Sequence, residues 1–298
     1  MERIRMVTFK KMSQLSIEDL TKIWNQGFEG YYINLSMDIN RFLTRAVNDG
    51  LTLEHSLVMY EGDEAIGFVM NGFRTVNGQK VAWNGGTGIS TEYRGRGFGR
   101  LLMEHNLTLY REQGANIALL EAFLQNERAI KLYQHVGYEI TEHLISLQLT
   151  EALPDSLLLT EEPNRYTVRF GLPVKLRQLP FNRTLAAWQS QWQAIKDGEC
   201  AIVSEGDAPI GYVLFKRMYG EDGHIEGIAI YQCEVEAGRE DKEQIMKLAL
   251  REAYQPLEAP IKRYAIFIRD TNPELLALLK SLGFTPYIEL VHMKQMIT

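Results

Sequence analysis

Arg94-Gly95-Arg96-Gly97-Phe98-Gly99-Arg100 is a turn rich in glycine and arginine that comes directly before an amphipathic helical pattern. Its glycines let backbone N–H groups converge on an anion, the first turn of the helix adds its dipole, and three arginines add positive charge. A strand pattern that ends with Ile89, Ser90 and Thr91 leads into the turn, and Gly114 ends the helix. The order strand, turn, helix predicts a site for a phosphorylated ligand.

This turn departs from the two best-known phosphate loops. A P-loop requires Lys and then Ser or Thr after its last glycine, whereas Arg100 and Leu101 follow Gly99. The dinucleotide fingerprint requires a third glycine where Arg100 stands. The spacing that is present is Arg-x-x-Gly-x-Gly, formed by Arg94, Gly97 and Gly99.

A second block follows the turn, from Asn126 to Tyr133, and closes with Gly137-Tyr138. Together the two blocks resemble motif A and its following block in the GNAT superfamily of acyl-CoA-dependent N-acyltransferases. The resemblance implies that the loop amides hold the pyrophosphate of coenzyme A and that acetyl-CoA is the cosubstrate. The cofactor-binding residues that it implies are Ile89, Ser90, Thr91, Arg94, Gly95, Arg96, Gly97, Phe98, Gly99, Arg100 and Asn126.

Composition narrows the class of protein further. The 298 residues carry a net charge of −6, which disfavours general nucleic-acid binding. No apolar run approaches the roughly 20 residues that span a bilayer, and the N-terminus lacks a signal-peptide core, so we expect a cytoplasmic protein without membrane contact. Two cysteines and six scattered histidines form no metal-ligand pattern, so we expect reduced thiols and no metal.

An internal repeat divides the chain. Residues 61–69 recur at 205–213, an offset of 205 − 61 = 144, and residues 126–138 recur at 272–284, an offset of 272 − 126 = 146. Two separate blocks at nearly one offset indicate a duplicated fold. We therefore predict two tandem GNAT-like α/β domains, each a mostly antiparallel mixed sheet flanked by helices.

Proline and acidic residues interrupt the hydrophobic pattern near the middle of the chain, which places the domain boundary there. The prediction is a catalytic domain over residues 1–150, a linker over 151–165 and a degenerate, non-catalytic copy over 166–298. In that copy Lys242 and Gln244 replace the two motif glycines. Added side chains and nearby acids would obstruct and repel a pyrophosphate.

Glu121 is the candidate general base of the first domain. Amine acetylation needs a neutral amine, while a free lysine amine has a pKa of about 10 and an α-amine about 8. Glu121 lies in the apolar run Ile117–Phe123, and its position resembles that of a glutamate that ribosomal-protein N-terminal acetyltransferases use. An outward-facing strand residue is the alternative interpretation. The aligned position in the second copy is Phe267.

Tyr133 is the candidate acid. A phenol with an ordinary pKa of about 10 stays protonated at neutral pH and can donate to a thiolate whose conjugate acid lies at about 8.5. The alternative is a core aromatic at helical spacing, although Leu279 replaces it in the second copy. Asn126 has two compatible roles, as a helix cap and as a ligand of the pantetheine arm. Gly85, Gly86 and Gly88 indicate a bulge or a close ligand approach.

The function predicted from these residues is an N-acetyltransferase that moves an acetyl group from acetyl-CoA to a primary amine of a small molecule or peptide by direct attack. Two alternatives stay open: a non-catalytic acyl-CoA-responsive binding protein, and a transferase that uses a longer acyl-CoA. Aromatic residues at Trp24–Tyr32 either border the acceptor entrance or cover the core. The sequence leaves the acceptor and the oligomeric state open.

Overall fold

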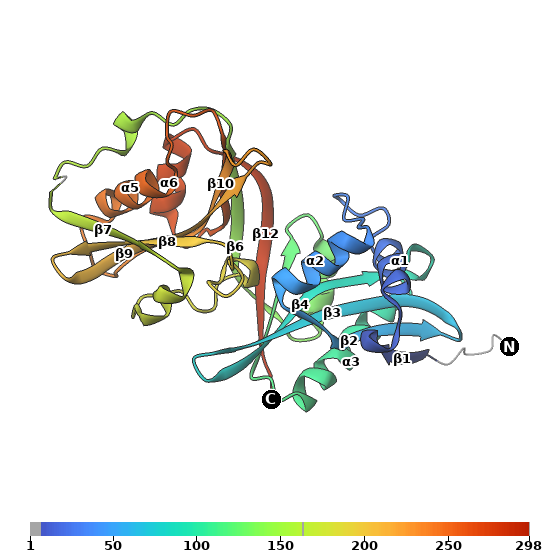
Figure 1. The fold of residues 1–298 in the computed structure, drawn as a ribbon. Coiled ribbons are helices and arrows are strands. Elements are labelled where there is room, and N and C mark those ends of the chain that lie inside the picture. The colour runs from blue at the N-terminus through green and yellow to red at the C-terminus, as the bar shows by residue number, and fades with distance from the viewer. Residues whose placement is uncertain (1–6, 163, 298) are drawn as a thin grey trace. The chain divides into compact units, whose positions relative to one another are not determined.

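The computed structural model describes residues 7–162 and 164–297 (Figure 1). The chain forms two compact units, unit 1 with Met1–Thr141 and His292–Thr298, and unit 2 with Glu142–Val291. Residues 151–165 fall within unit 2. Each unit has a mixed, mostly antiparallel sheet flanked by helices, so the predicted fold class is confirmed.

Unit 1 has the sheet order β1-β2-β3-β4-β5-β12, in which the last strand enters from His292 onward. The pairs from β1 to β4 are antiparallel, and β4 pairs with β5 in parallel. The elements are β1 (Val7–Lys11), η1 (Met12–Gln14), α1 (Ile17–Gly27), α2 (Ile39–Asp49), β2 (Leu51–Glu61), β3 (Glu64–Val76), β4 (Gln79–Ile89), η2 (Thr91–Tyr93), α3 (Phe98–Glu112), β5 (Ile117–Phe123), α4 (Glu127–His135) and β6 (Glu139–Leu149), which continues into unit 2.

Helices cover both faces of this sheet because its strand residues alternate between two apolar sets. On one face, Trp24 of α1 and Phe42 of α2 pack in a core with Phe68 and Met70 of β3. The neighbouring residue Asn71 points to the opposite face, where it bonds to α3. The candidate site lies at the end of β4, beyond the described residues of this strand that pair with β5.

Strands β4 and β5 pair over only part of their length. Within the described residues the pairing runs from Val81 with Ile117 to Asn84 with Leu120, although β4 continues to Ile89 and β5 to Phe123. Beyond these pairs, the backbone groups that would join the two strands are left to other partners. This separation opens the sheet beside Glu121.

The glycines of β4 explain how the strand passes α1. The register against β3 shifts between Asn84 and Gly86, so Gly85 is the bulge that these glycines predict. A Cβ atom on Gly88 would lie 2.9 Å from Gly27 Cα, and one on Gly86 would lie 3.0 Å from the Trp24 ring. The close approach at these two positions is therefore made by helix α1.

Unit 2 has the sheet order β12-β6-β11-β10-β9-β8-β7. Its strands β10 and β11 are parallel, and β11 pairs antiparallel with β6. The elements are η3 (Asp155–Leu158), β7 (Tyr166–Gly171), η4 (Pro173–Gln178), η5 (Trp188–Ser190), β8 (Glu199–Glu205), β9 (Ala208–Tyr219), β10 (Ile225–Val235), α5 (Lys242–Ala253), β11 (Lys262–Arg269), α6 (Pro273–Ser281) and β12 (Thr285–Met296), which continues into unit 1.

The predicted repeat is visible in the order of the elements. Helices α5 and α6 begin 242 − 98 = 144 and 273 − 127 = 146 residues after α3 and α4. The hairpin glycines Gly62 and Gly206 share positive φ angles of 64° and 59°. One face differs: short 3-10 turns η4 and η5 stand in unit 2 in the place that α1 and α2 take in the chain order of unit 1.

The last strands of the two repeats are exchanged. Strand β6 belongs to the first repeat by sequence, yet from Glu142 onward it lies in unit 2 beside β11. Strand β12 belongs to the second repeat, yet from His292 onward it lies in unit 1 beside β5. Each unit therefore takes its last strand from the other half of the chain.

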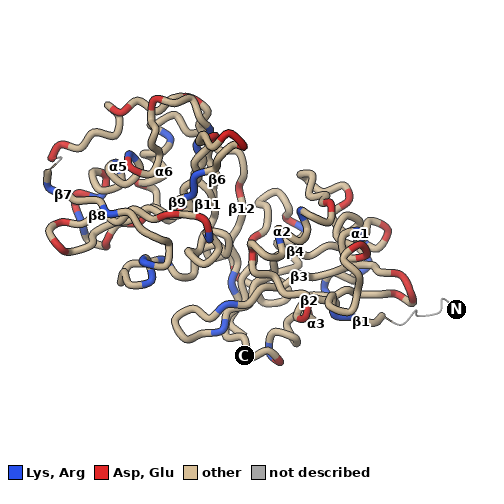
Figure 2. Tube along the Cα trace, in the orientation of Figure 1, with Lys and Arg blue, Asp and Glu red and all other residues tan. Residues whose placement is uncertain are grey.

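Basic and acidic residues both occur along the trace of each unit, as Figure 2 shows. Within residues 7–162 and 164–297, no helix is long and apolar enough to cross a membrane. Cys200 and Cys233 are both buried free thiols.

A buried polar network holds α3 against β3. The Asn71 side chain donates to Asn106 Oδ1 at 2.7 Å and accepts from the Tyr110 hydroxyl at 2.7 Å. All three side chains are fully buried, so each depends on the others for hydrogen bonding. The network fixes the helix that begins at the glycine turn.

We expect Asn71→Ala to lower the free energy of unfolding by about 2–4 kcal/mol, because it removes the hydrogen bonds that Asn71 makes to Asn106, Tyr110 and the His55 carbonyl. Urea denaturation followed by fluorescence measures the change. Adding Tyr110→Phe removes one of the orphaned groups, so the double variant should lose less than the sum of the two single losses. Additive losses would contradict the shared network.

Candidate functional site

A pocket of about 430 Å³ lies where the end of β4, the glycine turn, α4 and the segment after α1 meet. Eight of the predicted site residues line it: Ile89, Arg94, Gly95, Gly97, Gly99, Arg100, Asn126 and Tyr133. Among the described residues, Ser90, Thr91, Arg96, Phe98 and Glu121 are predicted site residues outside this lining. The pocket thus unites most of the glycine turn with the second sequence block.

The glycine turn has the backbone geometry that only glycine adopts at low cost. Gly95 and Gly97 have φ angles of 81° and 88°, and Gly97 is the N-cap of α3. With no side chain at the cap, the first N–H groups of α3 have no side-chain partner there. These donors and the helix dipole form an anion site at the pocket wall.

The Arg94 guanidinium is bound to backbone carbonyls. Its Nε donates to Ile89 O at 2.8 Å, and its Nη2 donates to Gly27 O at 3.0 Å and Glu29 O at 2.8 Å. Arg94 therefore connects the end of β4 to the segment after α1. This contact shapes the pocket, which Arg94 also lines.

The other arginines near the turn have different contacts. Arg96 lies over the rings of Tyr93 and Phe98, with 5.2 Å and 5.5 Å to the ring centroids. Arg100 pairs with Glu104 at 2.7 Å on the exposed face of α3. Arg128 of α4 also lines the pocket, and its Nη2 lies 3.0 Å from where a Gly95 Cβ would be. Arg128 was missed as a site residue, although it stands within the second sequence block.

The segment after α1 closes one side of the pocket through Tyr31. The Asn126 side chain caps α4 by accepting from Ala129 N at 3.2 Å, and its Nδ2 donates to the Tyr31 hydroxyl at 3.0 Å. Burial raises the pKa of Tyr31, and the bond from Asn126 partly opposes that rise. The capping role of Asn126 is confirmed, and its second bond ties α4 to the segment after α1.

Tyr133 lies in the wall of the pocket with 8% of its surface exposed. Burial raises the pKa of its hydroxyl to about 12, while bonds with the side chains of Thr87 and Asn84 work against the rise. Asn84 in turn bonds to Thr87 at 2.8 Å. The phenol therefore remains protonated throughout the neutral range and is held from the α3 side of the sheet.

Glu121 lies on the other face of the sheet. Its Oε2 accepts from Trp83 Nε1 at 2.7 Å, and its Oε1 bonds to His292 Nδ1 at 2.9 Å. Since Trp83 and Asn84 are successive strand residues, their side chains point to opposite faces. Glu121 and Tyr133 therefore flank, from opposite sides, the place where β4 and β5 separate. With 11% of its side chain exposed, Glu121 is not the outward-facing residue of the alternative interpretation.

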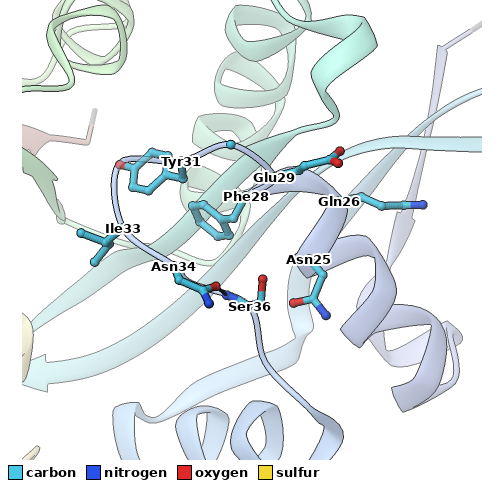
Figure 3. Close-up of a pocket in the computed structure, with 9 residues that line it drawn as sticks. Asn25, Gln26, Phe28, Glu29, Tyr31, Ile33, Asn34 and Ser36 are labelled. Atoms are coloured by element: carbon cyan, nitrogen blue, oxygen red, sulfur yellow. Dashed lines mark hydrogen bonds between the residues drawn. The ribbon is translucent and has the colours of Figure 1, made fainter.

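A second pocket of about 530 Å³ adjoins the same segment (Figure 3). Asn25 comes from α1, while Tyr31, Ile33, Asn34 and Ser36 come from the segment that follows it. Asn25 is already bound to the backbone of Met37, and Asn34 accepts from Ser36 N. These amides stabilise the segment that borders the main pocket.

The corresponding place in unit 2 is filled by ion pairs. Arg239 donates to Asp241 Oδ1 at 2.7 Å and to Glu205 Oε2 at 2.9 Å, and Tyr166 donates to Asp241 at 2.7 Å. The Arg239 bonds hold the pKa of the Asp241 carboxyl well below its usual range. Asp241 is the N-cap residue of α5, so a negative charge stands where Gly97 stands before α3. The alignment of Lys242 with Gly97 is therefore wrong by one residue, because Lys242 is already the first residue of α5.

The gap between the parallel strands is also occupied in unit 2. Strands β10 and β11 pair as far as Ile230 with Ala265 in the described residues. Beyond that point Arg269 of β11 donates to Glu234 of β10 at 2.5 Å. In the part of the chain that the structure describes, no group of three His, Cys, Asp or Glu side chains is arranged to hold a metal ion.

Comparison with known proteins defines the class. Residues 10–138 match the model of the Acetyltransferase (GNAT) family. A GCN5-related N-acetyltransferase from Sphaerobacter thermophilus aligns over 98% of this chain and 96% of its own, with 14% identity and a TM-score of 0.62. Another from Anabaena variabilis aligns over 98% and 73%, with 20% identity and a TM-score of 0.61. Among curated proteins, a sequence search finds no significant match.

A tandem GNAT protein from the clavulanic acid biosynthesis pathway, solved without acetyl-CoA, has the same fold over its full length. The alignment covers 98% of this chain and 99% of that one, with 13% identity and a TM-score of 0.60. Residues 10–138 are therefore similar to the GNAT acetyltransferase family, and the whole chain has the fold of a tandem GNAT protein. The resemblance that the two sequence blocks indicated is confirmed.

We expect Arg94→Lys to loosen the segment after α1, because an ammonium group cannot reach the three carbonyls that the planar guanidinium binds. The free energy of unfolding should fall by about 1–3 kcal/mol. Hydrogen exchange at Phe28–Tyr32 should accelerate. The matched control is Arg96→Lys, because Arg96 lies over the rings of Tyr93 and Phe98, so this variant should leave that exchange unchanged. Equal exchange in both variants would contradict the connecting role of Arg94.

Proposed function

We propose that unit 1 is an acetyl-CoA-dependent N-acetyltransferase that modifies a primary amine of a small molecule or peptide by direct attack. The observation that carries the proposal is that one pocket is lined by the positive-φ glycines before α3 and by Tyr133. A phosphate group suits the N-terminus of α3, and a thioester sulfur suits a place beside Tyr133. GNAT proteins use acetyl-CoA, and a cosubstrate of this kind carries both groups.

In the proposed binding mode, the pyrophosphate lies against the N–H groups that follow Gly97, with Arg128 and Arg100 beside it. The pantetheine arm runs toward the separation of β4 and β5, past Asn126 and Thr87. Acetyl-CoA supplies the activated acyl group. This placement leaves the amine acceptor to approach from the face that carries Glu121.

The proposed reaction is a direct transfer of the acetyl group from sulfur to nitrogen. The amine nitrogen attacks the thioester carbonyl, the C–S bond breaks, and the amine proton passes to Glu121 directly or through water. The departing sulfur receives a hydrogen bond from Tyr133. Because the pKa of Tyr133 is about 12 and that of a free thiol about 8.5, donation of a hydrogen bond is favoured over complete proton transfer.

Unit 2 is proposed to bind no acyl-CoA. The Asp241 carboxylate at the start of α5 would repel a pyrophosphate, and Arg239 is already neutralised by Asp241 and Glu205. The Arg269–Glu234 pair fills the gap that a pantetheine arm would need. In this proposal unit 2 contributes its part of the fold, and unit 1 performs the chemistry.

The defining test offers the protein acetyl-CoA with spermidine, kanamycin, free amino acids and peptides, and identifies products by mass spectrometry. We expect one acceptor class to gain an acetyl group with release of a thiol. Longer acyl-CoA donors run in parallel identify the preferred acyl chain. Tight acetyl-CoA binding without acceptor-dependent thiol release from any amine would favour the non-catalytic binding protein instead.

Tyr133→Phe should lower turnover by about 10²-fold, because it removes the donor aimed at the departing sulfur. Calorimetry should find acetyl-CoA affinity close to that of the unsubstituted protein, since the phenol contributes little to the bound ground state. Unchanged turnover would remove Tyr133 from the mechanism.

Gly97→Glu should weaken acetyl-CoA binding at least about tenfold, or 1.4 kcal/mol, because a carboxylate would stand at the anion site. Gly238→Glu is the matched control, since Gly238 has a similar φ of 82° but lies in unit 2. Equal affinity losses would mean that backbone strain, and not the anion site, explains the effect.

A further inference from the structure

The Glu121 carboxylate is held on both oxygens by side chains from two other strands. Trp83 Nε1 of β4 donates to Oε2 at 2.7 Å, and His292 Nδ1 of β12 lies 2.9 Å from Oε1. His292 is 3% exposed and is separated from Glu121 by 292 − 121 = 171 residues of sequence. The end of the chain thus brings an imidazole to the candidate base.

Hydrogen-bond donors and a nearby cation surround the Glu121 carboxylate. Arg74 of β3 interacts electrostatically with Glu121 and with Asp49 of α2, and burial lowers the pKa of Arg74 to about 10. Arg74 thus remains a cation at neutral pH. An indole N–H and an imidazole N–H are both suitable donors to an anion, and bonds to a charged acceptor are the stronger kind. The ring then has its proton on Nδ1.

The second repeat shows what this position holds when no base is present. Moving by the repeat offset of 146 residues takes His292 to Ser146 and Glu121 to Phe267. These two residues also meet in unit 2, where Phe267 N donates to Ser146 Oγ at 3.1 Å. The exchanged strand therefore packs at this place without an acid and an imidazole, so folding alone does not demand the pair in unit 1.

A general base must be held within a fraction of an ångström of its working position, because small displacements reduce the rate strongly. A glutamate on a strand has several free torsions unless its carboxylate is bonded. Trp83 fixes one oxygen, and the bond on the other oxygen removes the remaining rotation.

We infer that His292 is a positioning residue for Glu121, so that the strand contributed by the second repeat completes the active site of unit 1. This inference rests on the proposed transferase function, because it assigns a purpose to the orientation of Glu121. His292 acts through the carboxylate and does not itself contact the substrate.

The first measurement tests the bond without any reaction. Protein labelled with ¹⁵N-histidine should show one imidazole with a slowly exchanging proton on Nδ1, assigned to His292 by its loss in His292→Asn. In Glu121→Leu that proton should exchange rapidly, because its acceptor is gone. An unchanged imidazole signal in Glu121→Leu would overturn the inference, whatever the activity of the protein.

The second measurement tests the role, with the acceptor that the amine panel identifies. His292→Leu should lower kcat by more than about tenfold while the KM for acetyl-CoA stays within about twofold. His292→Asn places an amide N–H near the former Nδ1 position and should restore kcat to within about threefold of the unsubstituted protein. A purely structural role would give similar losses in both variants.

The control on the same strand is Gln295→Ala. Gln295 Nε2 donates to Val136 O at 3.1 Å, so this variant removes a bond made by β12 without touching Glu121. It should keep kcat within about twofold. Full activity in His292→Leu, or equal losses in the Leu and Asn variants, would overturn the inference. Absence of transfer to every amine by the unsubstituted protein would refute the proposed function and this role with it, while the imidazole signal would still report on the bond.

Discussion

The separation of β4 from β5 beyond the Asn84–Leu120 pair is the constraint on which the rest of unit 1 depends. A parallel pair of this kind normally continues its hydrogen bonds to the strand ends, and here each strand must find other partners. Helix α1 passes close behind the β4 glycines, while Arg94 binds the carbonyls at the entrance. These contacts keep β4 and β5 apart, with the Tyr133 phenol on one face of the sheet and the Glu121 carboxylate on the other.

The two repeats have the same order of strands and of their last two helices, but different side chains at two corresponding places. In unit 1 the helix that follows the fourth strand of the repeat begins at a bare glycine, and in unit 2 its counterpart begins at Asp241. The gap between the parallel strands is bordered by pocket residues in one unit and bridged by Arg269 and Glu234 in the other. The side chains at these two places thus differ between the units, in addition to the 3-10 turns η4 and η5 that stand where unit 1 has α1 and α2.

Local features of the sequence were sufficient to predict most of the fold and much of the candidate site. The glycine turn, the Asn126 cap and the two repeated blocks all depend on neighbours within one turn or hairpin. Contacts made at long range were invisible: two of the three carbonyls that Arg94 binds, Gly27 O and Glu29 O, lie 67 and 65 residues away in the sequence. The exchange of β6 and β12 has no local sequence signal either, so the bond between Glu121 and His292 was not predicted.

The exchanged last strands also bear on how the protein is made. A ribosome extends the chain from the N-terminus, and domains usually fold as soon as their own segment has emerged. Unit 1 does not have that option, because its sixth strand is synthesised only after all of unit 2. The part of β12 that pairs with the edge of β5 in the folded protein is therefore synthesised after unit 2, and so is His292, which bonds to Glu121. A chain that lacked β12 would carry the glycine turn and Tyr133 without the strand that pairs with β5 in unit 1.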